Sequence, residues 1–99
     1  MKNTEELKKK LNELKPSLKE KFNVKTIGIF GSYTRKEEKK GSDLDILVEL
    51  EESPSLSLLD FIKLENYLSE ALGVKVDLVE KNTLKPRIGK RILKEVVTI

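Results

Sequence analysis

Residues 25–50 read KTIGIFGSYTRKEEKKGSDLDILVEL, and this stretch decides the fold. It opens with a run of β-forming residues, 25–30, that ends at Gly31. A polar segment with the character of a helix start follows from Ser32. Residues 43–50 then alternate between apolar and mostly acidic side chains, which is the period of a strand with one buried face. The stretch therefore predicts a strand, a tight turn, a short helix and a second strand.

Upstream of this stretch, leucines recur at helical spacing from Leu7 to Leu18. Asn3 and Glu6 resemble a capping box, so we expect an amphipathic helix that begins there and ends near Phe22. Proline lacks the backbone N–H that a helix interior needs, so we expect a kink or a break at Pro16.

Downstream, Ser57 followed by Asp60 predicts the start of another helix, and Gly73 predicts its end. Residues 75–79 alternate like a third strand. The chain then turns into a last short helix, and residues 96–99 close as an extended piece. A length of 99 residues fits a single core. We therefore expect one domain, 1–99, of the α/β (α+β) class, with a small mixed sheet of three to four strands flanked by helices.

Composition excludes several classes of chemistry. The chain has no cysteine and no histidine, which removes disulfide scaffolds, thiol nucleophiles, imidazole bases and the usual zinc sites. Charged residues make up 37% of the chain, and no apolar run approaches the roughly 20 residues that a membrane helix needs. We expect a soluble, cytoplasmic protein without membrane attachment, in which carboxylates and hydroxyls do any chemistry.

The chain has four aspartates and thirteen glutamates, so glutamate is the usual acidic residue of its surface. The positions of the few aspartates therefore need a specific explanation. Asp43 and Asp45 are two apart on a predicted strand, so both point to one face with Cα atoms about 6–7 Å apart. Such like charges destabilise a partly buried face unless a cation lies between them, and oxygen ligands favour Mg²⁺ or Mn²⁺. Asp77 adds a third carboxylate if its strand neighbours theirs. The alternative is that all three are ordinary solvent-side acids.

The glycine and serine at the end of the first strand favour the functional interpretation. A strand that ends in Gly31-Ser32 and enters a helix presents backbone N–H groups and a hydroxyl where phosphate binds. Ten residues separate Ser32 from Asp43. This combination is much more specific than an isolated Asp-x-Asp.

The residues that carry these features resemble a known family. The runs Phe30-Gly31-Ser32, Ser42-Asp43-Leu44-Asp45-Ile46 and Val76-Asp77-Leu78, together with Arg35, are similar to the minimal nucleotidyltransferases of the DNA polymerase beta superfamily. Within it, the MntA-like antitoxin proteins of prokaryotes are the most similar group. The resemblance covers nearly the whole chain and implies a polymerase-beta-like nucleotidyltransferase fold.

The resemblance also implies an activity: transfer of a nucleoside monophosphate, AMP or another, from a triphosphate such as ATP to a hydroxyl. Asp43 and Asp45 would bind magnesium, and Asp77 would share a metal and help to deprotonate the acceptor. The nucleotide would be held by residues of the loop and its ends, Gly31, Ser32, Arg35 and Ser42. In this family the partner is often a helical HEPN toxin that receives AMP on a tyrosine.

Two positions depart from the family's pattern. Lys36 stands where a glycine usually follows the motif arginine, and Thr98 stands where the tail usually has a tyrosine. Neither is a metal position. The departure at Lys36 concerns the segment that would bind the phosphates, and the departure at Thr98 concerns a contact of the C-terminal tail.

Two other classes of function compete with the enzyme. The chain could be a binding module that masks its partner without catalysis, although such a protein has no need of a repulsive carboxylate cluster. It could also bind nucleic acid through the Lys8-Lys9-Lys10 run, which is more often one solvated helix face. A net charge of only +3 argues against direct DNA binding.

Overall fold

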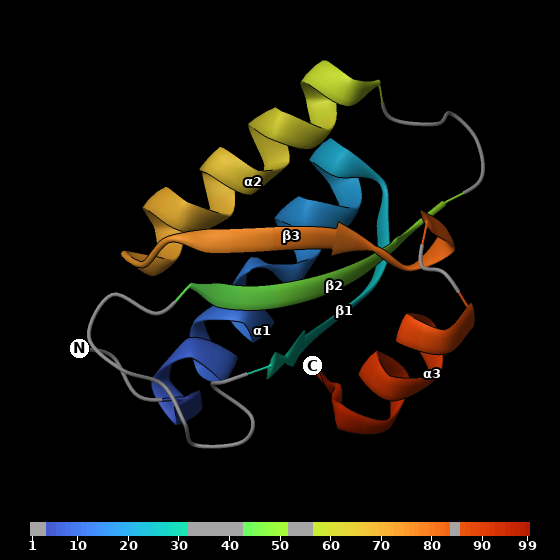
Figure 1. The fold of residues 1–99 in the computed structure, drawn as a ribbon. Helices are drawn as coiled ribbons and strands as arrows, with labels where there is room; N and C mark the ends of the chain where they lie inside the picture. The colour runs from blue at the N-terminus through green and yellow to red at the C-terminus, as the bar shows by residue number, and fades with distance from the viewer. Residues whose placement is uncertain (1–3, 32–42, 52–56, 84–85) are drawn as a thin grey trace.

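The computed structural model describes residues 4–31, 43–51, 57–83 and 86–99. The predicted order of helices and strands is confirmed within these ranges (Figure 1). The short helix expected from Ser32 lies outside them. The elements are α1 (Thr4–Phe22), β1 (Val24–Phe30), β2 (Leu44–Leu50), α2 (Leu58–Leu72), β3 (Val76–Glu80), the 3₁₀ turn η2 (Lys81–Thr83), α3 (Pro86–Glu95) and β4 (Val97–Thr98).

The strands form one mixed sheet in the order β3-β2-β1-β4. β1 runs antiparallel to both β2 and β4, whereas β2 and β3 are parallel and are connected through α2. Parallel neighbours need such a crossover connection, and a helix is the usual one. The sheet and its three helices confirm the predicted α+β class.

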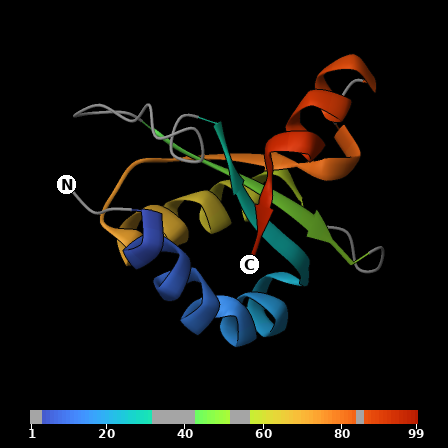
Figure 2. The same cartoon turned by 90° about the horizontal axis from the view of Figure 1, so that it is seen from below.

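Helices cover the two faces of the sheet unequally. Figure 2 shows α1 and α2 together on one side of the sheet and α3 on the other. The main core lies between the sheet and the first two helices. Its buried residues alternate along the strands and recur at helical spacing along α1 and α2, among them Leu7, Leu11, Leu18, Ile27, Ile29, Leu44, Ile46, Val48, Leu64, Leu68 and Leu72.

The second face of the sheet carries a smaller cluster under α3. Ile92 packs there against Phe30 and Leu47, with Val79 and Val96 at its margin. Leu47 and Val79 lie two residues further along β2 and β3 than Asp45 and Asp77 do. The apolar contact with α3 therefore lies further along β2 and β3 than the aspartates, and only Phe30, the sheet partner of Asp45, brings it next to one of them.

Helix α1 is one continuous element, so the break considered at Pro16 is wrong. Leu11 and Leu18 are fully buried on either side of the proline, and their burial holds both halves against the sheet. Pro16 itself is exposed. It has no N–H to donate to the carbonyl four residues earlier, and on this exposed side water can donate to that carbonyl instead. The helix is strongly charged, and in the described ranges no helix is both long and apolar enough to cross a membrane.

The predicted ends of α2 are confirmed. The Ser57 hydroxyl accepts a hydrogen bond from the Asp60 N–H at 3.1 Å, which caps the first turn. Gly73 ends the helix in the left-handed conformation, with φ of 70°, and its N–H donates to the carbonyl of Ser69 at 2.9 Å. These two caps fix where α2 begins and ends above the sheet.

Gly28 allows β4 to pack on β1. A Cβ atom at this position would lie 2.6 Å from Cγ2 of Val96 and 3.0 Å from the carbonyl oxygen of Val97. We predict that Gly28→Ala lowers the free energy of unfolding by about 1–3 kcal/mol, the usual cost of overpacking. Adding Val96→Ala should restore part of the loss, because it removes the first clashing atom. Denaturant titration of the single and double variants measures this, and strictly additive effects would contradict it.

Candidate active site

Asp43 directly precedes β2 and Asp45 is its second residue, on the face of the sheet opposite α1 and α2. Leu44 and Ile46, which alternate with them, are fully buried in the main core. Because successive side chains on a strand point to opposite faces, the two aspartates point away from that core. Both are half-buried. The predicted placement of the pair on one face is confirmed by this burial pattern.

Asp77 lies on the strand next to β2. β3 is parallel to β2, and the register pairs Asp45 directly with Asp77. Paired residues on neighbouring strands have their side chains on the same face and lie about 4.8 Å apart in the hydrogen-bonding direction. The sequence alone could not show whether the strand of Asp77 lies next to that of Asp45, and the register shows that it does. Asp77 is exposed, unlike its two half-buried counterparts.

The backbone brings the three aspartates to one place, but their carboxylates do not converge. Among the described residues, no group of three or more acidic, histidine or cysteine side chains is arranged to hold a metal ion. The oxygen donors still suit Mg²⁺ or Mn²⁺, the cations that carboxylates prefer. The described residues place the three aspartates on one face of the sheet, with Asp45 and Asp77 side by side on paired strands.

Gly31 brings the end of β1 against Asp45. It is buried and has φ of +80°, a conformation that side-chain-bearing residues rarely adopt. A Cβ atom at this position would lie 3.0 Å from Cγ of Asp45 and would overlap its Oδ2. Phe30, one residue earlier, pairs with Asp45 in the sheet. The backbone of Gly31 therefore adjoins the carboxylate group of Asp45, and glycine is required there for two separate reasons.

The other predicted nucleotide-binding residues, Ser32, Arg35 and Ser42, lie outside the described residues, as does Lys36. The described residues on either side of this segment are Gly31 and Asp43. Thr98 lies in β4 and pairs with Gly28. It is thus part of the edge of the sheet that is away from β3.

Glu49, which the sequence placed on the same face as the aspartates, has structural partners. The Thr26 hydroxyl donates to its Oε1 at 3.3 Å, and the Lys81 ammonium group lies 3.9 Å from the same oxygen. Its charge is therefore partly balanced within the fold. In the same way, Lys8 of the lysine run pairs with Glu5 on α1 at 3.4 Å.

Two hydrogen bonds that the sequence analysis missed hold β3 to α2. The Val76 N–H donates to the Ser69 hydroxyl at 3.1 Å, and the Leu78 N–H donates to Oε2 of Glu65 at 3.0 Å. These bonds are made on either side of Asp77. The only signal in the sequence is that Glu65 and Ser69 are four residues apart, and so lie on one side of a helix that also carries other polar residues.

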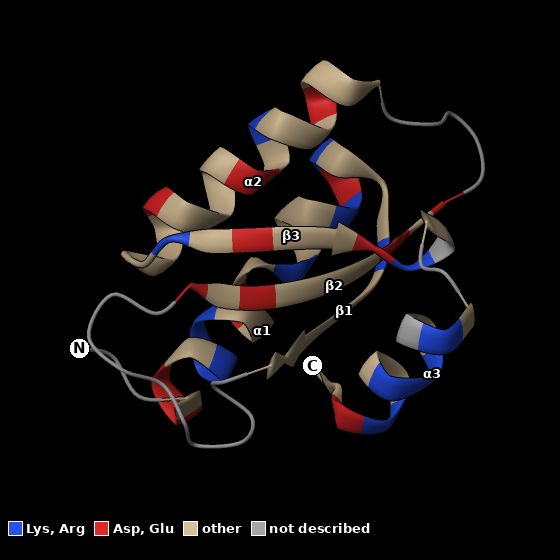
Figure 3. Cartoon of the chain, in the orientation of Figure 1, with Lys and Arg blue, Asp and Glu red and all other residues tan. Residues whose placement is uncertain are grey.

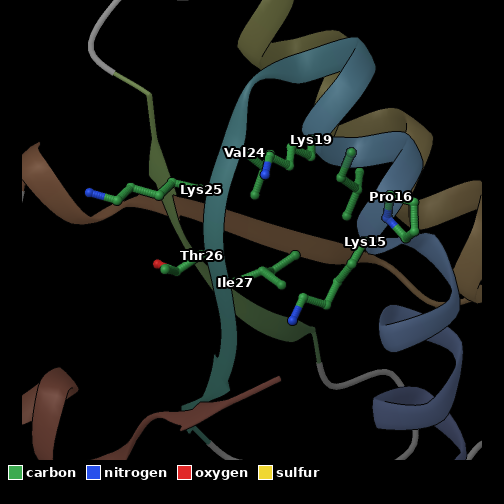
Figure 4. A pocket seen from close by; sticks show the side chains of 8 residues that line it. Lys15, Pro16, Lys19, Val24, Lys25, Thr26 and Ile27 are labelled. Atoms are coloured by element: carbon green, nitrogen blue, oxygen red, sulfur yellow. The ribbon is translucent and has the colours of Figure 1, made fainter.

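Neither of two pockets lined by described residues includes the aspartates. One, of about 450 Å³, lies between α1 and β1, where Figure 4 shows Lys15 and Lys19 of the helix facing Val24 and Ile27 of the strand. The other, of about 410 Å³, lies between the start of α2 and the end of β3 and includes Leu58, Phe61 and Val79. Among the described residues, no helix covers the aspartates, of which Asp77 is exposed and Asp43 and Asp45 are half-buried.

Comparison with known proteins agrees with this geometry. A family model of the nucleotidyltransferase domain matches residues 11–99, nearly the whole chain. The chain belongs to the nucleotidyltransferase family. The resemblance read from its motifs is thus confirmed, and the chain is a nucleotidyltransferase.

Similar proteins match over their whole length. The chain is 53% identical to the protein adenylyltransferase MntA of Thermococcus cleftensis, over 96% of this chain and 94% of that protein. It is 49% identical, over all of both chains, to a candidate protein adenylyltransferase of Methanocaldococcus jannaschii. A solved structure named as a minimal nucleotidyltransferase has a TM-score of 0.82 and 34% identity, covering 99% of this chain and 97% of that one.

A more distant likeness concerns the fold alone. A crystal structure of a toxin-antitoxin pair with AMP-PNP has a TM-score of 0.73 and 24% identity to this chain. The match covers 91% of this chain and 69% of that one. The nucleotidyltransferase fold is therefore kept over a wide range of sequence.

We predict that Gly31→Ala disturbs Asp45 and lowers stability. The left-handed backbone conformation alone should cost about 1–3 kcal/mol of unfolding free energy when a Cβ is present. The clash with the Asp45 carboxylate adds to this cost. In the double variant Gly31→Ala/Asp45→Ala the two closest atoms are removed, and the backbone strain and the 3.2 Å contact with Cβ of residue 45 remain, so part of the stability should return. Thermal unfolding of both variants tests this, and a fully stable Gly31→Ala protein would show that the contact is unimportant.

Proposed function

We propose that this chain transfers AMP, or another nucleoside monophosphate, from ATP or a related triphosphate to a hydroxyl of a protein partner. The partner we propose is a helical HEPN-type toxin, the acceptor is one of its tyrosines, and the chain acts in the cytoplasm as its antitoxin. One minimal nucleotidyltransferase domain, residues 1–99, would carry the activity. The observation that supports this most directly is that Asp45 and Asp77 are register partners on neighbouring strands, with Asp43 two residues from Asp45 on the same face.

The similar proteins support the acceptor class. The relative with 53% identity is named a protein adenylyltransferase, which is an enzyme that modifies protein. The toxin-antitoxin structures share the fold, and one of them is described as a HEPN toxin bearing AMP in complex with an MNT antitoxin. The exposed position of Asp77 suits a protein acceptor, because a folded partner cannot reach a buried group.

The aspartates have two roles in this proposal, one for Asp43 and Asp45 and another for Asp77. Asp43 and Asp45 would hold the magnesium or manganese ion that accompanies the triphosphate, and Asp77 would share a metal ion on the side of the acceptor. Metal ions in such sites neutralise phosphate charge and stabilise the charge that develops during transfer. Gly31, Ser32, Arg35 and Ser42 would bind the phosphates of the nucleotide through backbone N–H groups, hydroxyls and a guanidinium.

The transfer is a substitution at the α-phosphorus atom. The acceptor oxygen forms a bond to this phosphorus, and the bond from the phosphorus to the oxygen that bridges to the β-phosphate breaks. Pyrophosphate leaves with that oxygen. The acceptor proton passes to the Asp77 carboxylate, which lies at the exposed side of the site. Positioning and charge stabilisation do most of the work in such reactions, so the absence of histidine and cysteine is no obstacle.

We predict that Asp45→Asn weakens metal-linked stabilisation. A ligand that binds only the folded state raises stability by about 2.7 kcal/mol at a hundredfold excess over its Kd. Magnesium with a non-hydrolysable ATP analogue should therefore raise the melting temperature of the wild type. In Asp45→Asn the increase should shrink, while the ligand-free protein is as stable or more stable because repulsion is relieved.

The matched control for this experiment is Glu49→Gln, which makes the same chemical change on the same face of β2. Glu49 is already paired with Lys81, so the ligand-induced increase should be kept. An Asp45→Asn protein that is strongly destabilised without ligand would indicate that Asp45 is a structural hydrogen-bonding residue instead.

We predict that Asp77→Asn abolishes transfer but largely spares nucleotide binding. Asp77 comes from a different strand than the pair next to the phosphate loop, so its interactions belong mainly to the transition state. Calorimetry measures the affinity for the triphosphate, and the mass shift of a co-purified partner measures AMP incorporation. Glu80→Gln on the same strand is the control and should leave both unchanged.

The same measurement separates the two classes of function. Unchanged incorporation in Asp77→Asn would refute the mechanism with three carboxylates. If the wild type incorporates no AMP with partner, magnesium and ATP present, the chain is better explained as a binding module that masks its partner.

A further inference from the structure

β3 is the outer strand on its side of the sheet, and two of its N–H groups are bonded to side chains of α2. Alternate N–H groups of a strand point to opposite sides, so those of Val76 and Leu78 point away from β2. In most sheets such outward groups bind water or attract another strand. Here Ser69 accepts from Val76 and Glu65 accepts from Leu78, both in partly buried surroundings. The outer side of β3 is thus fixed to the helix that precedes it.

Glu65 and Ser69 act together. They are four residues apart on α2, so their side chains lie on one side of the helix. The Ser69 hydroxyl donates its hydrogen to the carbonyl oxygen of Glu65 at 3.0 Å, which directs a lone pair toward β3. Glu65 contributes a carboxylate, whose hydrogen bonds to N–H groups are shorter and stronger than those of neutral acceptors. We call these two residues the α2 clamp.

The α2 clamp holds the residues on both sides of Asp77. Val76 and Leu78 are its neighbours in sequence, and their side chains are buried in the main core. Asp77 points to the opposite face and is exposed. The buried alternation of β3 and its pairing with β2 set its register from one side. The directional hydrogen bonds to Glu65 and Ser69 restrain it from the other side.

We propose that Glu65 and Ser69 are positioning residues for Asp77, keeping β3 at the level at which Asp77 lies beside Asp45. The proposal rests on the proposed function, since it assigns the purpose of the alignment to metal binding and transfer. In the described sheet β3 has five residues and one strand neighbour, so backbone pairing restrains it from the side of β2 only, and the α2 clamp restrains it from the other side. Loss of outer residues that orient metal ligands typically costs 10–100-fold in metal affinity or activity.

The first test measures the clamp directly by amide hydrogen exchange. In Glu65→Ala the Leu78 N–H loses its partner and should exchange at least tenfold faster, as should the Val76 N–H in Ser69→Ala. The N–H groups of β1 should be unaffected. Glu65→Gln keeps an acceptor oxygen and should restore most of the protection. Glu70→Ala removes a carboxylate from an exposed position on the same helix and is the matched control.

The second test asks whether the alignment matters at the site. Mn²⁺ binding to the protein loaded with a non-hydrolysable ATP analogue should weaken about tenfold in Glu65→Ala. Incorporation of AMP into the partner should fall in kcat by a similar factor, while KM for ATP stays within about twofold, because Asp43 and Asp45 are untouched. Glu65→Gln and Glu70→Ala should resemble the wild type in both measurements.

The outcomes separate this inference from the proposed function. Unchanged exchange at Leu78 in Glu65→Ala, or faster exchange with unchanged Mn²⁺ affinity, overturns the positioning role. A rise in KM at constant kcat overturns it as well. If the wild type transfers no AMP, the proposed function fails, but exchange and Mn²⁺ affinity still decide whether the clamp aligns Asp77.

Discussion

The site depends on one constraint, which is that β2 must bury one face completely while its other face carries the carboxylates, Asp43 and Asp45 among them. β2 is flanked by β1 and β3, so its backbone is hydrogen-bonded on both sides and cannot rotate or slip. A shift of one residue would exchange the two faces and move Asp45 into the apolar core, which is far too costly for a charged group. The same packing that stabilises the domain therefore fixes the direction of the two carboxylates.

The unequal cover on the second face follows from the same arrangement. α3 packs over Leu47 and Phe30, and leaves the beginning of β2 and β3 without a helix among the described residues. Figure 3 shows acidic positions on β2 and β3 side by side in this uncovered region. Asp77 is exposed where Asp45 is half-buried, so the site has a sheltered side and an open side. A nucleotide held at the sheltered side would leave the open side to the hydroxyl of a second protein.

Much of this fold could be predicted from the sequence, because its elements have strong local signals. The alternation along β2, the leucine spacing of α1 and the caps Ser57 and Gly73 each depend on neighbouring residues alone, and all are confirmed. Of the kink or break expected at Pro16, the break is wrong, because burial of leucines on both sides outweighs one missing hydrogen bond. Local rules do not include such tertiary packing.

The candidate site divides in the same way. The pairing of Asp43 and Asp45 on one face needed only the strand period, but the level of Asp77 beside Asp45 depends on strand order, which no local pattern contains. The contact of Gly31 with Asp45 was also hidden, because the two residues are 14 positions apart in the sequence and meet only through the pairing of β1 with β2. Motif resemblance supplied the association of these residues, and the sheet register gives it a physical basis.

A strand at the edge of a small sheet is a weak place to put a reactive group, since edge strands fray and attract other chains. In the proposed function this position is useful, because an interior strand would be bordered on both sides and would leave less room for a protein acceptor. The helix α2 resolves this conflict by covering the outer N–H groups of β3 from the face opposite the aspartate. The edge is thereby closed to further strands, while the carboxylate on the other face stays accessible.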